Sequence, residues 1–152
     1  MESFWIPGRM PNLNDVIAAS ASFDRSYKAR GRKRWSQYNE LKQAWSREIL
    51  LYSRGRGLKE ITTTCFTFMF VEQDKRRDPD NFIGGGMKLI FDGMKDARLI
   101  PNDGWKEVRE IRTYWTVDAE NPGVLVILTK DPGPVDSWQK AHAIYSAFEE
   151  KK

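Results

Sequence analysis

Apolar residues recur at two different spacings along the chain, and each change of spacing marks an expected element. Residues 3–7, Ser-Phe-Trp-Ile-Pro, indicate a short strand that stops at proline, and a loop rich in Pro, Asn and Gly follows through Asn14. We expect the chain to stay irregular from there through residues 25–34. After Ser36 the spacing becomes three or four residues, which predicts an amphipathic helix that ends before Gly55. The residues that define this helix are Tyr38, Leu41, Trp45, Ile49 and Tyr52.

A run of β-branched and aromatic residues at 61–71 predicts a strand. Both of its faces are rich in apolar side chains, so we expect it to be covered on both sides over part of its length. One face carries Cys65, Met69 and Val71, and the other carries Phe66, Phe68 and Phe70.

The second half of the chain predicts another helix, two strands and a final helix. After a polar loop that ends at Asn81, the next helix is expected to turn Met87, Ile90, Phe91 and Met94 toward the core. Residues 108–117 and 124–128 have the composition of strands and are joined by Asn-Pro-Gly, so we expect an antiparallel hairpin. Residues 135–150 return to helical spacing.

The order strand, helix, strand, helix, hairpin, helix indicates one α+β domain, in which a mixed or antiparallel sheet packs against helices. We expect this domain to span residues 1–152, with a core at 1–134 and a C-terminal helix at 135–152. A chain of 152 residues can fold without disulfides, and its single cysteine, Cys65, is expected to be a buried thiol. Because long apolar stretches are absent and Glu2 is acidic, we expect a cytoplasmic protein.

Charge adds a second expectation, because the positive residues are clustered. The net charge of +4 is modest, but no acidic residue falls between Asp24 and Glu40. Such a cluster attracts the phosphate backbone of DNA, although a solvated loop has the same composition. The expected DNA-binding residues are Arg25, Lys28, Arg30, Arg32, Lys33 and Arg34, together with Arg76 and Arg77.

The candidate chemistry lies in the run Asp78-Pro79-Asp80-Asn81. Carboxylates two residues apart on an extended segment project to the same side, and Pro79 disfavours helix at Asp78. Such a pair repels itself unless a cation lies between its members, and Mg²⁺ prefers hard oxygen ligands together with waters and phosphate oxygens. Taken alone, these residues are also typical of turns and helix caps. Their neighbours therefore carry the functional interpretation.

Further polar residues follow in a defined order. Lys88 and Asp92 are four residues apart and share a helix face, and Asn102-Asp103 lies in a polar turn that leads into a strand. Together with the opening strand, its Pro- and Asn-rich loop and the basic segment, this order resembles the RusA family of Holliday-junction resolvases. The likeness covers most of the chain up to Leu128.

The resemblance implies a homodimeric, Mg²⁺-dependent endonuclease that resolves four-way DNA junctions by paired nicks, with Mn²⁺ able to substitute. Carried over by position, Asp78, Asp80 and Asp103 match the family's metal-binding aspartates, and Lys88 matches its assisting lysine. The supporting positions implied by the resemblance are Asp92, Asn81 and Asn102.

The sequence departs from the family pattern at two places. Residues 82–87, which include Gly84-Gly85-Gly86, place the lysine about one helical turn farther along than in the best-known members. Each glycine costs about 1 kcal/mol in a helix, so a flexible corner before Lys88 is the alternative to a continuous helix. Asn102 stands where the family often has an aspartate, which removes one negative charge from the predicted site.

Two other functions fit the same residues. A nuclease for flaps or other branched DNA would carry the same metal-binding pattern, and a catalytically silent DNA-binding protein would keep the basic residues alone. The run from Gly84 to Lys88 does not match a nucleotide phosphate loop, because Leu89 stands where Ser or Thr is required. His142, the only histidine, lies on the last expected helix and suggests no nucleophile partner.

Overall fold

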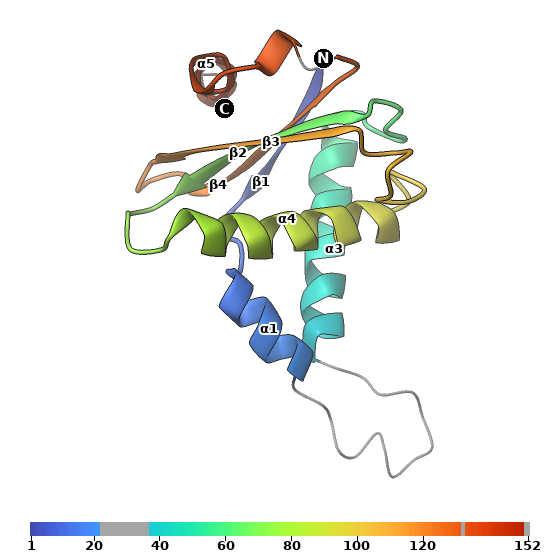
Figure 1. Ribbon diagram of the computed structural model, residues 1–152, viewed down its shortest axis with the longest axis vertical. Helices are drawn as coiled ribbons and strands as arrows, with labels where there is room; N and C mark the ends of the chain where they lie inside the picture. Colours follow the sequence, from blue (N-terminus) through green and yellow to red (C-terminus); the bar gives the residue numbers. More distant parts are fainter. Residues whose placement is uncertain (22–36, 132, 151–152) are drawn as a thin grey trace.

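A computed structural model describes residues 1–21, 37–131 and 133–150, which form one α+β domain (Figure 1). A four-stranded sheet has the order β1-β4-β2-β3. The expected α+β class is therefore confirmed. The strands are β1 (Glu2–Pro7), β2 (Cys65–Glu72), β3 (Glu110–Val117) and β4 (Gly123–Thr129). The described helices are α1 (Leu13–Ala21), α3 (Gln37–Gly55), α4 (Pro79–Asp96) and α5 (Trp138–Glu149), with a short 3-10 turn, η1 (Gly133–Val135).

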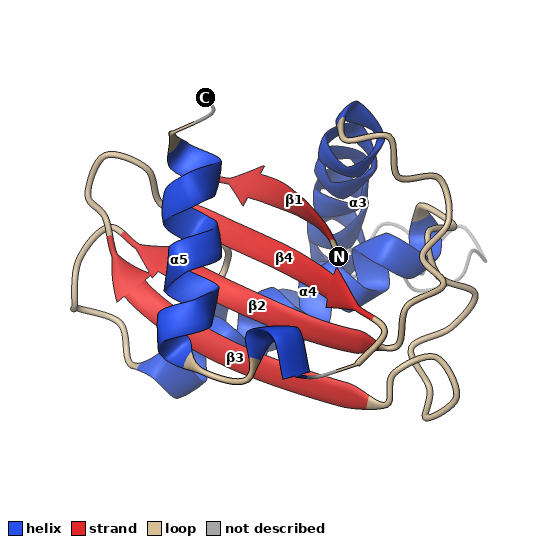
Figure 2. Ribbon diagram, turned by 90° about the horizontal axis from the view of Figure 1, so that it is seen from above, coloured by secondary structure: helices blue, strands red, loops and turns tan. Residues whose placement is uncertain are grey.

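The predicted hairpin between residues 108–117 and 124–128 is wrong. β4 lies between β1 and β2 and is antiparallel to both, whereas β3 runs parallel to β2 at the edge of the sheet (Figure 2). The physical reason is the difference in burial. Every residue of β4 is buried, which suits a central strand, whereas β3 has only exposed and half-buried residues, which suits an edge.

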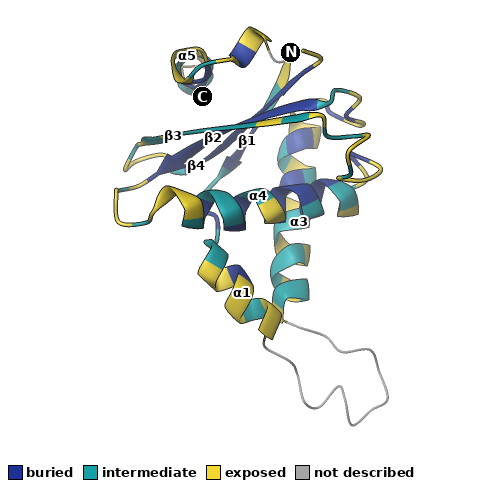
Figure 3. Cartoon of the chain, viewed as in Figure 1, coloured by how far each residue is buried: buried dark blue, intermediate teal, exposed yellow. Residues whose placement is uncertain are grey.

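α4 is the crossover connection between the two parallel strands. It follows β2, packs on one face of the sheet and delivers the chain to β3. α3 lies on the same face, and α5 covers the opposite face (Figure 1). Buried residues concentrate in the strands and in α4 (Figure 3). Among the residues described, no helix is both long enough and apolar enough to cross a lipid bilayer.

The two faces of β2 belong to two separate hydrophobic cores. Phe66 and Phe68 pack edge-on against Phe91 of α4, with ring centroids 5.3 and 5.5 Å apart. Met69 and Val71 belong to the core beneath α5. Cover on both sides of this strand is therefore confirmed, although the strand begins at Cys65 and the residues from 61 to 64 precede it.

Residues 13–21 form a helix where the sequence pattern predicts an irregular chain. Asn12 and Asp15 cap its start reciprocally: the Asp15 backbone N–H donates to Asn12 Oδ1 at 2.8 Å, and the Asn12 backbone N–H donates to Asp15 Oδ2 at 3.0 Å. Val16 is the one buried residue of this helix. A helix with so little buried surface has no clear apolar period, so the signal in the sequence is the Asn-x-x-Asp spacing.

α4 runs through its three consecutive glycines without a break, and a flexible corner does not form. A Cβ on Gly85 would lie 2.3 Å from the backbone carbonyl carbon of Asn12, and one on Gly86 would lie 2.7 Å from the Phe70 ring. The glycines therefore let the chain before α1 and the sheet approach the helix more closely than any other residue would allow.

The edge of the sheet at β3 is partly covered by a side chain. The indole N–H of Trp138, the first residue of α5, donates to the backbone carbonyl of Trp115 at 2.9 Å. This carbonyl belongs to the row that an edge strand leaves without a neighbouring strand. Trp138 thus occupies part of the edge that another strand would need.

We expect Gly85→Ala to destabilise the protein by about 3 kcal/mol, because its methyl group would collide with backbone that cannot rotate away. Gly84→Ala is the matched control. A Cβ at Gly84 meets the Leu13 side chain at 3.6 Å, an ordinary contact, so alanine there should gain up to about 1 kcal/mol in helix propensity. Urea denaturation of both variants measures these changes, and equal stability of the two would contradict the close approach.

Candidate functional site

Asp78 and Asp80 lie together at the N-terminal end of α4. Asp78 is the N-cap residue, and its extended backbone lets its carbonyl accept from the N–H of Asn81 at 3.0 Å. Its carboxylate makes no capping hydrogen bond. Both side chains are exposed, and neither has a hydrogen bond or salt bridge to any other residue within the described ranges. Asp78 thus holds the helix-cap position that the alternative interpretation predicts, but its carboxylate is not used for capping.

A buried ion pair fixes the loop that presents these two carboxylates. Glu72, the last residue of β2, is only 4% exposed. Arg77 binds it with two hydrogen bonds, from Nε to Oε2 at 2.9 Å and from Nη2 to Oε1 at 2.5 Å. The remaining Arg77 nitrogen, Nη1, donates to the Met10 carbonyl at 2.7 Å, and Arg9 lies 3.4 Å from Glu72. The residue before Asp78 is thus anchored to both the sheet and the N-terminal loop.

Asp103 lies at the opposite end of α4 and is held by a lysine. Lys95 Nζ is 3.1 Å from Asp103 Oδ1 and 3.6 Å from Asp92 Oδ1, and Lys88 Nζ is 3.4 Å from Asp92 Oδ2. Lys88, Asp92, Lys95 and Asp103 therefore form a row of alternating charges, which we call the α4 charge row. The hydrogen bond to Asp103 is the main reason that the pKa of Lys95 lies above its usual value.

The structure does not bring Asp103 to Asp78 and Asp80 within one chain. Lys95, the partner of Asp103, is fifteen residues beyond Asp80, or about 22 Å along the helix axis. Mg²⁺ holds its ligands at about 2.1 Å, so one ion cannot touch both ends of α4. In the part of the chain that the structure describes, no three His, Cys, Asp or Glu side chains are grouped to hold a metal.

The other predicted site residues lie at different places along and beyond α4. Lys88 is eight residues, or about 12 Å, along the helix from Asp80, so it joins the α4 charge row and not the aspartate pair. Its ammonium also lies 5.3 Å from the centre of the Tyr38 ring. Asn81 follows the pair in the first turn of the helix, and Asn102 is exposed beside Asp103.

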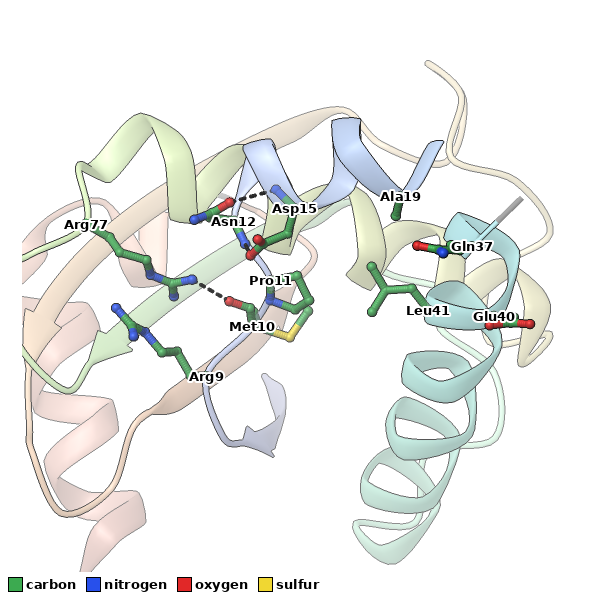
Figure 4. Close-up of a pocket in the computed structure, with 10 residues that line it drawn as sticks. All are labelled: Arg9, Met10, Pro11, Asn12, Asp15, Ala19, Gln37, Glu40, Leu41 and Arg77. Atoms are coloured by element: carbon green, nitrogen blue, oxygen red, sulfur yellow. Dashed lines mark hydrogen bonds between the residues drawn. The ribbon is translucent and has the colours of Figure 1, made fainter. Parts of the chain in front are cut away.

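Two pockets adjoin the loop before α4. One of 480 Å³ has Asp78, Phe82 and Trp115 in its wall. The other, of 630 Å³, has Arg77 on one wall and Ala19 and Gln37 on the opposite side, near the two ends of the segment 22–36 (Figure 4). The aspartate pair therefore adjoins one side of Arg77, and the pocket that Ala19 and Gln37 line adjoins the other.

The expected DNA-binding residues fall into three groups. Residues 25–34 lie outside the described ranges, so DNA contact there stays a prediction. The Arg76 side chain is 88% exposed, and its guanidinium lies 3.7 Å from Asp74 at the surface, so it is available to a phosphate. Arg77 is 12% exposed, and its guanidinium is used within the chain. We therefore describe Arg77 as the residue that positions the aspartate loop.

Sequence reasoning missed Glu72, Arg9, Tyr38 and Lys95. Glu72 stands at the end of an apolar strand, and a charge in that position is a signal for a buried partner. Lys95 is three residues after Asp92 and therefore on the same helix face, which the sequence shows. Tyr38 and Arg9 carry no comparable local signal, because their partners are distant in the chain.

Comparison with known proteins adds no family assignment. No protein-family model matches the sequence, and no curated protein matches it.

Asp92 joins the charge row to α3. Tyr38 donates its hydroxyl proton to Asp92 Oδ2, and burial together with this hydrogen bond raises the pKa of Tyr38. Burial by itself would raise the pKa of Asp92, but the Tyr38 hydrogen bond and the charges of Lys88 and Lys95 outweigh it. The pKa of Asp92 therefore lies below its usual value.

We expect Asp92→Asn to lower the free energy of unfolding by about 1 to 3 kcal/mol at neutral pH. Because the folded pKa of Asp92 is depressed, this contribution is present above the unfolded value of about 3.9 and is lost as pH falls through the folded pKa. The difference between wild type and variant should thus shrink below about pH 4. Urea denaturation across pH measures it.

Asp96→Asn is the control, since Asp96 is 38% exposed and lies 3.5 Å from Lys42 in a surface pair. Its effect should stay within about 0.5 kcal/mol at every pH. If Asp92→Asn behaves in the same way, the Asp92 contacts do not stabilise the fold.

Proposed function

We propose that this protein is a Mg²⁺-dependent endonuclease of the RusA resolvase type, which cuts four-way DNA junctions by paired nicks. The observation that carries the proposal is the pair of exposed carboxylates at the start of α4, Asp78 and Asp80, directly after a loop held by the Arg77–Glu72 ion pair. An enzyme needs its metal ligands both available and rigidly presented, and the anchored start of α4 satisfies both needs.

The chemistry of the pair fits a hard divalent cation. Two carboxylates with open space around them leave room for waters and phosphate oxygens, which Mg²⁺ usually retains or recruits. When bound, the ion supplies Lewis-acid stabilisation of the phosphate and a lowered pKa for the attacking water. Arg76, exposed two residues before Asp78, is placed to neutralise a neighbouring phosphate.

The separation of Asp103 from the pair supports a site shared between two chains. A two-fold axis that crosses α4 near its middle would put the N-terminal end of the helix in one protomer beside the C-terminal end in the other. Asp103 of one chain would then complete the ligand set formed by Asp78 and Asp80 of its partner. A homodimer would carry two such sites, which matches the two equivalent strands of a four-way junction.

We expect Asp80→Asn to abolish cleavage of a four-way junction in Mg²⁺ while leaving junction binding nearly unchanged. The substitution removes a ligand charge with almost no change of shape, and phosphate contacts elsewhere supply the affinity. Cleavage of four-way, three-way and flap substrates, measured beside binding in EDTA, gives both readouts. Near-normal cleavage by the variant would remove Asp80 from the site.

The substrate panel also separates the alternatives. Preferred cleavage of flaps over four-way junctions would assign a flap nuclease. Wild-type protein that binds junctions but cuts none of the substrates in Mg²⁺ or Mn²⁺ would assign the catalytically silent DNA-binding protein. A silent protein is the expected outcome if the separated aspartates are not brought together between two chains.

A mixing experiment tests whether the site is shared. If Asp80→Asn and Asp103→Asn chains are refolded together, mixed dimers hold one site with both lesions and one intact site. With about half of the dimers mixed, nicking should return to about a quarter of the wild-type rate. Cleavage assays of the refolded mixture measure this return.

The control for the mixing experiment is Asp78→Asn with Asp80→Asn. Both changes lie in the same half of the site, so no mixed dimer regains an intact one and activity should stay absent. If the Asp80→Asn and Asp103→Asn mixture is equally inactive, although sedimentation shows dimers, the shared site is wrong.

A further inference from the structure

Trp105 is the most exposed of the large hydrophobic side chains that the structure describes, at 97%. Its indole ring makes no ring or cation contact with any described residue. Tryptophan normally buries most of its surface, so an almost fully solvated indole favours a role in binding.

The backbone around Trp105 is well anchored. The Gly104 carbonyl accepts from the N–H groups of Glu107 at 3.2 Å and Val108 at 2.9 Å, which closes a turn with Trp105 at its tip. Ile100, before the turn, is buried, and Val108, after it, packs against the main core. The turn thus presents the indole at a defined place and limits the entropy lost when a ligand stacks on it.

The surroundings of Trp105 are polar and include cations. Asp103 is two residues before it and Lys95 pairs with that aspartate, while exposed Lys106 and Arg109 follow it on either side of Glu107. An apolar protein partner would need a contiguous apolar patch, and the residues next to this tryptophan in the turn do not supply one. An exposed aromatic ring with cations in the same turn suits a nucleic acid, whose bases offer flat π faces beside phosphates.

We propose that Trp105 stacks on a DNA base that is unstacked at the branch point, next to the phosphate to be cut. This inference rests on the proposed function, because it needs branched DNA at the metal site. In the shared arrangement, the turn that carries Asp103 brings Trp105 to the Asp78 and Asp80 of the partner chain. Trp105 is then a positioning residue that favours binding of DNA with accessible bases. Binding of plain duplex depends on phosphate contacts and not on Trp105.

The test compares Trp105→Ala, Trp105→Phe and the control Leu51→Ala. Leu51 is also an exposed apolar residue, at 64%, but it borders a separate apolar pocket with Trp5 and Phe148. Fluorescence anisotropy in EDTA measures the dissociation constants for a four-way junction, a single strand and a duplex of the same length. Because the side chain is solvated, thermal melting should be the same for all three variants and wild type.

Trp105→Ala should weaken junction and single-strand binding by roughly 5- to 100-fold, the range of one base–aromatic stack, with less than about twofold change for duplex. Phenylalanine should restore most of the loss, and Leu51→Ala should bind as wild type does. In addition, 2-aminopurine at the branch point should be quenched by wild type and not by Trp105→Ala.

Three results would overturn the inference. Unchanged junction binding by Trp105→Ala, beside normal binding by wild type, rejects the stacking role and leaves the nuclease proposal standing. Loss of the dimer in sedimentation of Trp105→Ala makes Trp105 a contact between protomers. If wild type itself binds no DNA, the proposed function fails first, and the stacking role fails with it.

Discussion

The close approach of α4 to Asn12 and Phe70 is the contact on which the arrangement of the site depends. Gly85 and Gly86 let this helix lie against both the N-terminal loop and the sheet, so α4 cannot move without disturbing both. It is a continuous helix of 18 residues, about 27 Å long. The two groups of acidic residues at its ends are therefore held apart by a rigid spacer, and a single chain cannot gather them.

The Arg77–Glu72 ion pair is shielded from solvent and holds the chain that leads to Asp78. Burying one carboxylate alone would cost several kcal/mol, but a bidentate guanidinium satisfies both of its oxygens. The remaining nitrogen of the guanidinium reaches the Met10 carbonyl, so the pair also ties the end of β2 to the chain before α1. Asp78 and Asp80, one and three residues after Arg77, stay exposed and are free to bind a cation.

Much of the fold follows from local pattern, and what does not depends on distant contacts. The strands at the start of the chain and before Asp74, and the helices from Gln37 and Trp138, were predictable because their apolar residues are periodic. The pairing of β4 with β1 and β2 was not, because a short connection through Pro122 is typical of a hairpin. The fully apolar composition of β4 was the available warning, since it marks a central strand.

In the candidate site, too, the features set by local pattern were predictable and those set by distant contacts were not. Asp78 and Asp80 could be proposed from sequence because two carboxylates at this spacing beside proline suggest a cation site. The extended segment that was expected to carry both of them ends at Asp78, however, and Asp80 lies in the first turn of α4. The ion pair between Asp103 and Lys95 could not be proposed, because the order of residues alone does not show how the turn that carries Asp103 lies against the end of α4. Tyr38 was assigned only to helix packing, whereas its hydroxyl contacts Asp92, 54 positions away. Contacts of that separation depend on how α3 crosses α4, which no local pattern specifies.

The covering of the β3 edge by Trp138 restricts how copies of this protein can associate. With that indole on the Trp115 carbonyl, sheet-to-sheet extension at β3 would first require α5 to lift its N-terminal turn from this edge. Half-exposed Ile111, Trp115 and Val117 would otherwise make this strand a template for aggregation. The guarded edge therefore directs strand pairing between copies away from β3, toward β1 at the other edge of the sheet or to helical surfaces.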